Sequence, residues 1–161
     1  MNVGFIGTGH MGNPIAGHLI KAGHQLTVHD KRQESTANLI ELGAAWGDNP
    51  AAVAAASDVV FTSLPGPPEV EDAVLGAGGL LEGARPGMVH VDLTSNLPSA
   101  VRRIAQLEAA REVAFLDAPL AGMVVGALPF WPQSREWGYA PSAALSVMML
   151  LVGYLWFIHR I

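Results

Sequence analysis

Three glycines near the start of the chain have the spacing of a loop that binds a pyrophosphate. Gly7, Gly9 and Gly12 form G-x-G-x-x-G within the stretch GFIGTGHMG. In such a loop the first glycine permits a tight turn, the second lets the backbone approach the pyrophosphate, and the third lets the next helix pack close to a sheet. The backbone N–H groups of His10, Met11 and Gly12 then face the anion, and the helix dipole adds a favourable charge. The pattern indicates dinucleotide binding.

The surroundings of the glycines favour this interpretation over a glycine-rich turn without a ligand. A predicted strand precedes Gly7, and a predicted helix with apolar residues at helical spacing follows the motif. A second predicted strand ends at Asp30, where such a unit places an acidic residue near the adenosine ribose. We therefore assign residues 7–12, Thr8 included, and Asp30 to a dinucleotide site.

The residues after the second predicted strand bear on the choice of cofactor. Asp30 can accept hydrogen bonds from the ribose hydroxyls and repels a 2′-phosphate, which favours NAD. Lys31 and Arg32 follow directly, and cations there either receive the 2′-phosphate of NADP or are solvated charges on a loop. NAD is the expected cofactor, with NADP as the alternative.

The elements that must position these residues alternate between strands and helices. Short apolar runs bounded by glycine, proline or aspartate predict strands over 2–6, 25–29, 44–46, 58–64, 88–91 and 113–116. Runs with helical spacing, caps or early prolines predict helices over 10–21, 34–42, 51–56, 69–75, 80–84 and 99–111. Such alternation implies parallel βαβ units with right-handed crossovers. We expect a Rossmann-type α/β domain, a doubly wound and mainly parallel sheet, over residues 1–127.

Composition narrows the classes of function. The chain has 161 residues, enough for one domain with a core, and its net charge of −5 with scattered Lys and Arg argues against nucleic acid as a partner. It has no cysteine, which excludes disulfides, thiol catalysis and cysteine-bound metal. The six histidines show no metal or acid–base constellation. The start, MNVGFIG, lacks the features of a signal peptide, so we expect a cytoplasmic chain.

The last part of the chain differs in composition. Residues 128–137 have the character of a linker, and residues 138–158 are 21 residues without a formal charge. As a helix they span roughly 31 Å at about 1.5 Å per residue, close to a bilayer core. One interpretation is a transmembrane helix that anchors the chain. The others are a helix that packs on the domain or on another subunit, and a junction left by a truncated or frame-shifted gene.

Four motifs occur in order within residues 2–127: GFIGTGHMGNPIAGHLIKAGH at 4–24, SLPGPPEV at 63–70, DLTSNLPS at 92–99 and LDAPLAG at 116–122. Together they resemble the β-hydroxyacid dehydrogenases, such as 3-hydroxyisobutyrate dehydrogenase and tartronate semialdehyde reductase. That family shares its amino-terminal dinucleotide domain with 6-phosphogluconate dehydrogenase. The resemblance implies hydride transfer between a nicotinamide cofactor and a small 3-hydroxy acid.

The resemblance implies further site residues. Leu64 and Pro65 match a Leu-Pro pair that lies along the cofactor, although the same pair also serves as a strand terminator. Thr94 and Ser95 match a hydroxyl pair near the nicotinamide and the substrate. Their alternative role is an N-cap for the helix that begins near Pro98, and the two roles are compatible.

Two departures from the family pattern concern substrate and catalysis. The family places Ser-Gly-Gly after Asp-Ala-Pro to receive the substrate carboxylate, where this chain has Ala121, Gly122 and Met123. The hydroxyl is lost and a bulky side chain replaces a glycine, so binding of a hydroxy acid there is in doubt. The family's catalytic lysine lies beyond these residues, whereas this chain has lysine only at Lys21 and Lys31.

These features leave three functional hypotheses. The first is the dinucleotide domain of a hydroxyacid dehydrogenase or reductase, weak or inactive alone because loss of a positioned acid or base costs about 10²–10⁴-fold in rate. The second is a cofactor-binding pseudoenzyme or sensor, in one version tethered to a membrane. The third is a non-functional fragment. The substrate and the oligomeric state are not indicated by the sequence.

Overall fold

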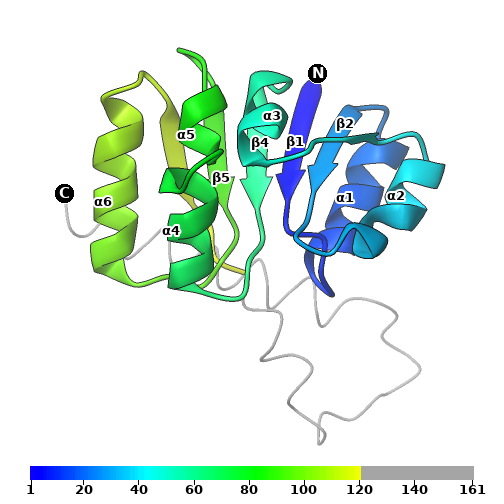
Figure 1. Cartoon of the computed structure of the whole chain (residues 1–161), viewed down its shortest axis with the longest axis horizontal. Helices are drawn as coiled ribbons and strands as arrows, with labels where there is room; N and C mark the ends of the chain where they lie inside the picture. Colours follow the sequence, from blue (N-terminus) through cyan, green and yellow to red (C-terminus); the bar gives the residue numbers. More distant parts are fainter. Residues whose placement is uncertain (121–161) are drawn as a thin grey trace, which may run out of the picture. The chain divides into compact units, whose positions relative to one another are not determined.

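The structure is a computed structural model, and it describes residues 1–120. In this part of the chain, parallel strands form one sheet (Figure 1). The strands are β1 (Asn2–Ile6), β2 (Gln25–His29), β3 (Ala45–Trp46), β4 (Val59–Thr62), β5 (Val89–Asp92) and β6 (Ala114–Asp117). Their order is β3-β2-β1-β4-β5-β6, and every neighbouring pair is parallel. The order reverses direction between β1 and β4, as in doubly wound Rossmann folds. The predicted α/β class is therefore confirmed for the described residues.

The helices connect successive strands. They are α1 (Gly12–Lys21), the 3-10 helix η1 (Gln33–Thr36), α2 (Ala37–Glu41), α3 (Pro50–Ala55), α4 (Pro67–Leu75), α5 (Leu80–Gly83) and α6 (Pro98–Ala109). Proline stands in the first turn of α3, α4 and α6, where its fixed φ suits the helix and its missing N–H costs nothing. Asn49 caps α3 by accepting a hydrogen bond from the Ala52 N–H at 2.8 Å.

Both faces of the sheet are covered, which explains why its strands are nearly continuous apolar runs. One face packs strands β1 and β2 on helices α1 and α2, through a cluster that includes Val3, Phe5, Ala16, Leu26, Val28 and Leu39. The other face is covered by α3 to α6, which stand in front of the strands in Figure 1, through clusters that include Ile6, Val53, Val60, Leu80, Val70, Val74 and Ile104. The packed layers hold the strand ends, and the loops that follow them, in fixed positions.

The predicted helix over 34–42 needs a correction, whereas the other elements differ from their predicted bounds by at most two residues at either end. The run over 34–42 was expected to form a single helix, but it is η1 followed by the short α2. The Thr36 hydroxyl donates to the Gln33 carbonyl at 2.7 Å, and such a local side-chain bond to the backbone competes with the regular helical pattern.

The carboxyl-terminal predictions fall outside the described residues. The linker at 128–137 and the apolar run at 138–158 belong to that part of the chain, as do Ala121, Gly122 and Met123. Within residues 1–120, no helix is long and apolar enough to cross a membrane.

Candidate functional site

The loops that follow the strands meet at one edge of the sheet because the strands are parallel. Backbone hydrogen bonds join neighbouring loops there. The Gly7 N–H donates to the His29 carbonyl at 2.9 Å, and the Ser63 N–H donates to the Ile6 carbonyl at 2.9 Å. In open α/β sheets ligands bind at this edge, between adjacent strands whose connections leave in opposite directions. Here β1 and β4 are those strands.

The glycine loop after β1 turns where only glycine fits. Gly7 has φ of +92°, which disfavours residues with a Cβ, and a Cβ there would collide with the Ser63 carbonyl oxygen. A Cβ on Gly12 would collide with the Gly7 carbonyl oxygen and lie 2.9 Å from the Phe5 ring. Gly7 and Gly12 therefore let the turn and helix α1 lie close to the sheet, as the motif predicts.

Gly9 has a different environment. A Cβ placed on Gly9 would have no atom within 4 Å, so the fold itself does not require glycine there. The N–H groups of His10, Met11 and Gly12 donate no hydrogen bond to any group in residues 1–120. They start helix α1, whose dipole places partial positive charge at the same point. The loop therefore presents free donors beside an open space, which is the arrangement that an anion needs.

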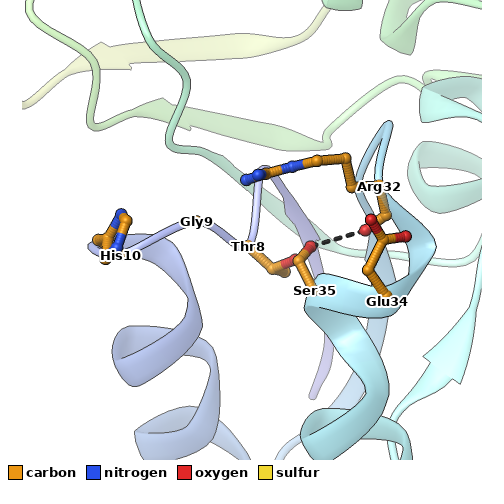
Figure 2. A pocket seen from close by; sticks show the side chains of 6 residues that line it. All are labelled: Thr8, Gly9, His10, Arg32, Glu34 and Ser35. Carbon is orange, nitrogen blue, oxygen red and sulfur yellow. Dashed lines mark hydrogen bonds between the residues drawn. The ribbon is translucent and has the colours of Figure 1, made fainter.

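A pocket of about 370 Å³ adjoins this loop, and its walls come from the loop and from the start of η1. It is lined by Thr8, Gly9, His10, Arg32, Glu34 and Ser35. Figure 2 shows the Arg32 side chain extended above Thr8, with Glu34 and Ser35 on the side of η1. Glu34 and Ser35 were not predicted as site residues, because η1 brings them to the loop only in the folded chain.

Asp30 lies between the loop and the pocket wall. Its carboxylate accepts the Thr8 N–H at 2.7 Å through Oδ2 and the Arg32 N–H at 2.9 Å through Oδ1. The Thr8 hydroxyl, in a nearly buried side chain, lies 2.8 Å from the Ser35 hydroxyl. Asp30 thus fixes the two segments that line the pocket, in addition to any contact with a ligand.

Lys31 and Arg32 are adjacent in sequence but face different partners. The Lys31 Nζ donates to Asp72 of α4 at 2.8 Å, and its side chain is 77% exposed. That hydrogen bond, together with the Asp72 charge, raises the pKa of Lys31 above its usual value. Arg32 lines the pocket instead. Of the two cations that the sequence offered for a 2′-phosphate, the structure places Arg32 at the pocket.

The second half of the edge is formed by the loops after β4 and β5. The Leu64 N–H donates to the Thr94 hydroxyl at 3.0 Å, which ties the two loops together. Pro65 stands two residues before the start of α4. Thr94 is buried, whereas the neighbouring Ser95 is exposed. The structure thus brings Leu64 and Thr94 into contact and leaves the Ser95 side chain exposed beside them.

The alternative role of Thr94 and Ser95 as a helix cap is wrong. The residue that precedes the first turn of α6 is Leu97, and no side chain caps that helix. The Asn96 side chain accepts the Leu97 N–H at 2.9 Å just outside the helix. Thr94 instead uses its backbone N–H to donate to Asp92 Oδ1 at 3.0 Å.

The expectation that no histidine has an acid–base partner is wrong for His90. Its Nδ1 lies 2.7 Å from Glu108 Oε1, and both side chains are fully buried between β5 and α6. The partners are 18 residues apart, so no local spacing in the sequence signals the pair.

Asp117, the last residue of β6, is in register with Asp92 of β5. Desolvation by neighbouring groups, and then the charge of Asp92, raise the pKa of the exposed Asp117 carboxyl above its usual value. The folded chain therefore holds this proton more tightly than the unfolded chain, and the carboxyl lowers stability as pH rises through that range. We expect Asp117→Asn to raise the Tm near neutral pH and to leave it unchanged well below about pH 4. Thermal unfolding at both pH values checks this, and a lower Tm at neutral pH contradicts it.

Comparison with known proteins agrees with this geometry. The sequence-family model for the NAD-binding domain of 6-phosphogluconate dehydrogenase matches residues 2–129. A second family model, for a protein of unknown function (DUF3309), matches residues 120–161. A 3-hydroxyisobutyrate dehydrogenase-like protein of Arabidopsis thaliana is 41% identical over 126 residues, 78% of this chain and 38% of that protein. The 2-(hydroxymethyl)glutarate dehydrogenase of Eubacterium barkeri is 39% identical over 127 residues, 79% of this chain and 42% of that protein.

A solved structure shares the fold as well. Psf3 in complex with NADP⁺ and 2-OPP superposes with a TM-score of 0.71 at 31% identity, over 78% of this chain and 45% of that one. The chain thus spans less than half the length of each of these relatives. Because the family model covers most of the sequence, the chain belongs to the NAD(P)-binding domains of the 6-phosphogluconate dehydrogenase type, whose relatives include the 3-hydroxyisobutyrate-dehydrogenase-like oxidoreductases.

Proposed function

We propose that the glycine loop of residues 7–12 holds the pyrophosphate of a nicotinamide dinucleotide. The observation that carries the proposal is the open space at Gly9 beside three free N–H groups at the start of α1. Glycine at this position has no role in the packing of the loop itself, so a ligand that must come close to the backbone explains it.

The two halves of the dinucleotide follow from the strand order. The pocket beside Arg32 and Ser35 lies on the β2 side of the loop and suits the adenosine ribose. The loops after β4 and β5, with Leu64, Pro65 and Thr94, lie on the other side of the switch point and suit the nicotinamide half. When bound, the nicotinamide supplies or accepts a hydride.

The charges at the pocket support NAD over NADP. Glu34 and Arg32 line the pocket, the Asp30 carboxylate bonds the Thr8 and Arg32 N–H groups behind that lining, and Lys31 is engaged by Asp72. Two carboxylates against one guanidinium disfavour a 2′-phosphate, which adds close to two negative charges. Arg32 offsets part of this repulsion, so discrimination is expected to be moderate.

Reciprocal changes in cofactor preference test this assignment. Asp30→Asn removes a negative charge, so the affinity for NADPH relative to NADH should rise about fivefold. Arg32→Ala should lower the same ratio by a similar factor, since exposed charge pairs are worth up to about 1 kcal/mol, or roughly fivefold. Dissociation constants for both cofactors, measured by calorimetry at one salt concentration, give the ratio.

Lys31→Ala is the matched control, because it removes the neighbouring cation that pairs with Asp72. We expect it to leave the ratio unchanged. An equal effect of Lys31→Ala and Arg32→Ala would contradict the placement of the two side chains. An increase in NADH preference on Asp30→Asn would contradict the role of the carboxylate.

We further propose that this dinucleotide domain, ending near residue 127, belongs to an oxidoreductase that acts on small hydroxy acids. The relatives that are dehydrogenases support this class. Among the 161 residues of the chain, lysine occurs only at Lys21, the last residue of α1, and at Lys31, which pairs with Asp72. Lys21 ends α1 and the Lys31 ammonium is engaged by Asp72, so neither is a free acid or base in the described residues, and we expect cofactor binding with little turnover from this chain alone.

Turnover is tested directly with 3-hydroxyisobutyrate and NAD⁺, followed by the absorbance of NADH. Cofactor binding without detectable NADH supports a binding module that lacks its acid or base. Steady NADH production at rates typical of dehydrogenases would contradict the binding-only proposal and support the enzyme.

A further inference from the structure

A chain of four buried polar side chains runs from helix α6 to the edge where the loops meet. Glu108 of α6, His90 of β5, Thr62 of β4 and Asp92 of β5 are each 0% exposed. Glu108 Oε1 lies 2.7 Å from His90 Nδ1, His90 Nε2 lies 2.9 Å from the Thr62 hydroxyl, and that hydroxyl donates to Asp92 Oδ1 at 2.8 Å. The proposed dinucleotide site uses none of these four side chains directly.

The hydrogen-bond donors and acceptors determine which atoms carry most of the protons in this network of four side chains. Asp92 accepts the Thr62 hydroxyl and the Thr94 N–H on Oδ1 and the Asn96 amide on Oδ2, so Asp92 is the ionised member. The single hydroxyl hydrogen of Thr62 is used on Asp92, so His90 Nε2 must donate to Thr62.

One further proton bridges His90 and Glu108. Whether that proton sits on the imidazole or on the carboxyl, the two side chains together carry no net charge, which lowers the free-energy cost of burying them. The direction of each hydrogen bond is therefore fixed along the four side chains, from the proton shared by Glu108 and His90 to the Asp92 carboxylate.

The network is not what stability alone would select. Glu108 Oε2 is buried and has no hydrogen-bond partner among the described residues. A buried polar atom without a partner costs free energy, and apolar side chains of similar volume often stabilise a core at least as well. Phe115 and Ile104 beside the network show that apolar groups already fill this region. Such a departure from the most stable core points to a role beyond packing.

The outer end of the network reaches the proposed nicotinamide side of the site. Asp92 orients the Thr94 backbone through its N–H, and the Thr94 hydroxyl accepts the Leu64 N–H at 3.0 Å. The loops after β4 and β5 are thus fixed to one another through Asp92. No bond of this network reaches the glycine loop or the Arg32 pocket.

We propose that Thr62, His90 and Glu108 are positioning residues that hold Asp92, and through it the Leu64 and Thr94 loops, in the geometry that receives the nicotinamide half of the cofactor. This inference rests on the proposed function for the identity of the ligand. It predicts a selective effect, since the adenosine half is held by elements outside the network.

The test compares NADH with ADP-ribose, which has the adenosine and pyrophosphate but no nicotinamide. Thr62→Val removes the central hydroxyl at nearly constant volume, and His90→Phe removes both ring nitrogens. Both variants should bind NADH at least about fivefold more weakly, the lower range of site-to-site coupling, with ADP-ribose affinity unchanged. Thr62→Ser keeps the hydroxyl and should restore NADH binding.

Ser57→Ala is the control. Ser57 is as buried as Thr62, but it lies before β4 and donates to the Val53 carbonyl within its own segment. It should change neither affinity. Equal losses for both ligands in Thr62→Val, or wild-type affinity for NADH, would overturn the proposal.

Hydrogen exchange in the ligand-free chain separates this inference from the proposed function. Thr62→Val should speed exchange of the Leu64 and Thr94 amides more than that of the Gly7 amide, which donates to His29. If the wild-type chain binds no dinucleotide, the proposed function fails, and selective exchange still supports a positioning network. Uniform exchange across these amides would overturn the positioning role whether or not a dinucleotide binds.

Discussion

Gly9→Ala is expected to remove most dinucleotide affinity while leaving the stability of the fold unchanged. A Cβ at this position meets no protein atom within 4 Å, and the backbone there is not in the left-handed region. The methyl group would instead project into the open space beside the loop, whose free N–H groups stand at the start of α1. Overpacking a close contact costs about 2 kcal/mol or more, which is a roughly thirtyfold or larger loss of affinity.

Gly17, inside helix α1, supplies the matched control. A Cβ on Gly17 would make only an ordinary contact of 3.9 Å with Leu39. Gly17→Ala should keep dinucleotide affinity and gain up to about 1 kcal/mol of stability, because alanine is the better helix former. Calorimetric titration and thermal unfolding of the two variants give both quantities. Unchanged affinity in Gly9→Ala would show that no ligand approaches the loop at this point.

Gly12→Ala is expected to have the largest effect on folding. The added methyl would collide with the Gly7 carbonyl oxygen, which the turn holds in place, and would lie 2.9 Å from the Phe5 ring. Neither the backbone nor a ring that is 0% exposed can yield without moving α1 off the sheet. We expect a loss of about 3 kcal/mol, a large share of the stability of a small domain.

Urea unfolding followed by circular dichroism measures this loss against wild type and Gly17→Ala. A midpoint unchanged in Gly12→Ala would mean that α1 is not packed as the structure has it. The contrast between positions 9 and 12 is informative on its own. Both are glycines of one motif, but the fold requires the second and only a ligand explains the first.

Much of the fold was predictable because its signals are local. The strands over 2–6 and 25–29 coincide with β1 and β2, since each is a short run closed by Gly7 or Asp30. The cap at Asn49 is also a local signal, because its side chain accepts a hydrogen bond from the Ala52 N–H, three residues later. The glycine loop followed from spacing and context, and the structure placed its donors at the start of α1.

The features that escaped prediction depend on residues far apart in sequence. The pairing of His90 with Glu108 needs the register of β5 against α6, which no spacing encodes. The pocket wall at Ser35 needs η1 to fold toward the loop, and the sequence suggested a regular helix there. The separation of Lys31 from Arg32 depends on Asp72, an acid on α4.

The dinucleotide site itself is best tested by titrating the purified chain with NADH and, separately, with NADPH. We expect saturable binding of one NADH per chain, weaker binding of NADPH, loss of both in Gly9→Ala, and retention of both in Gly17→Ala. A chain that unfolds cooperatively, and is therefore folded, but takes up neither cofactor would refute the site. So would a Gly9→Ala variant that binds NADH as tightly as the wild type.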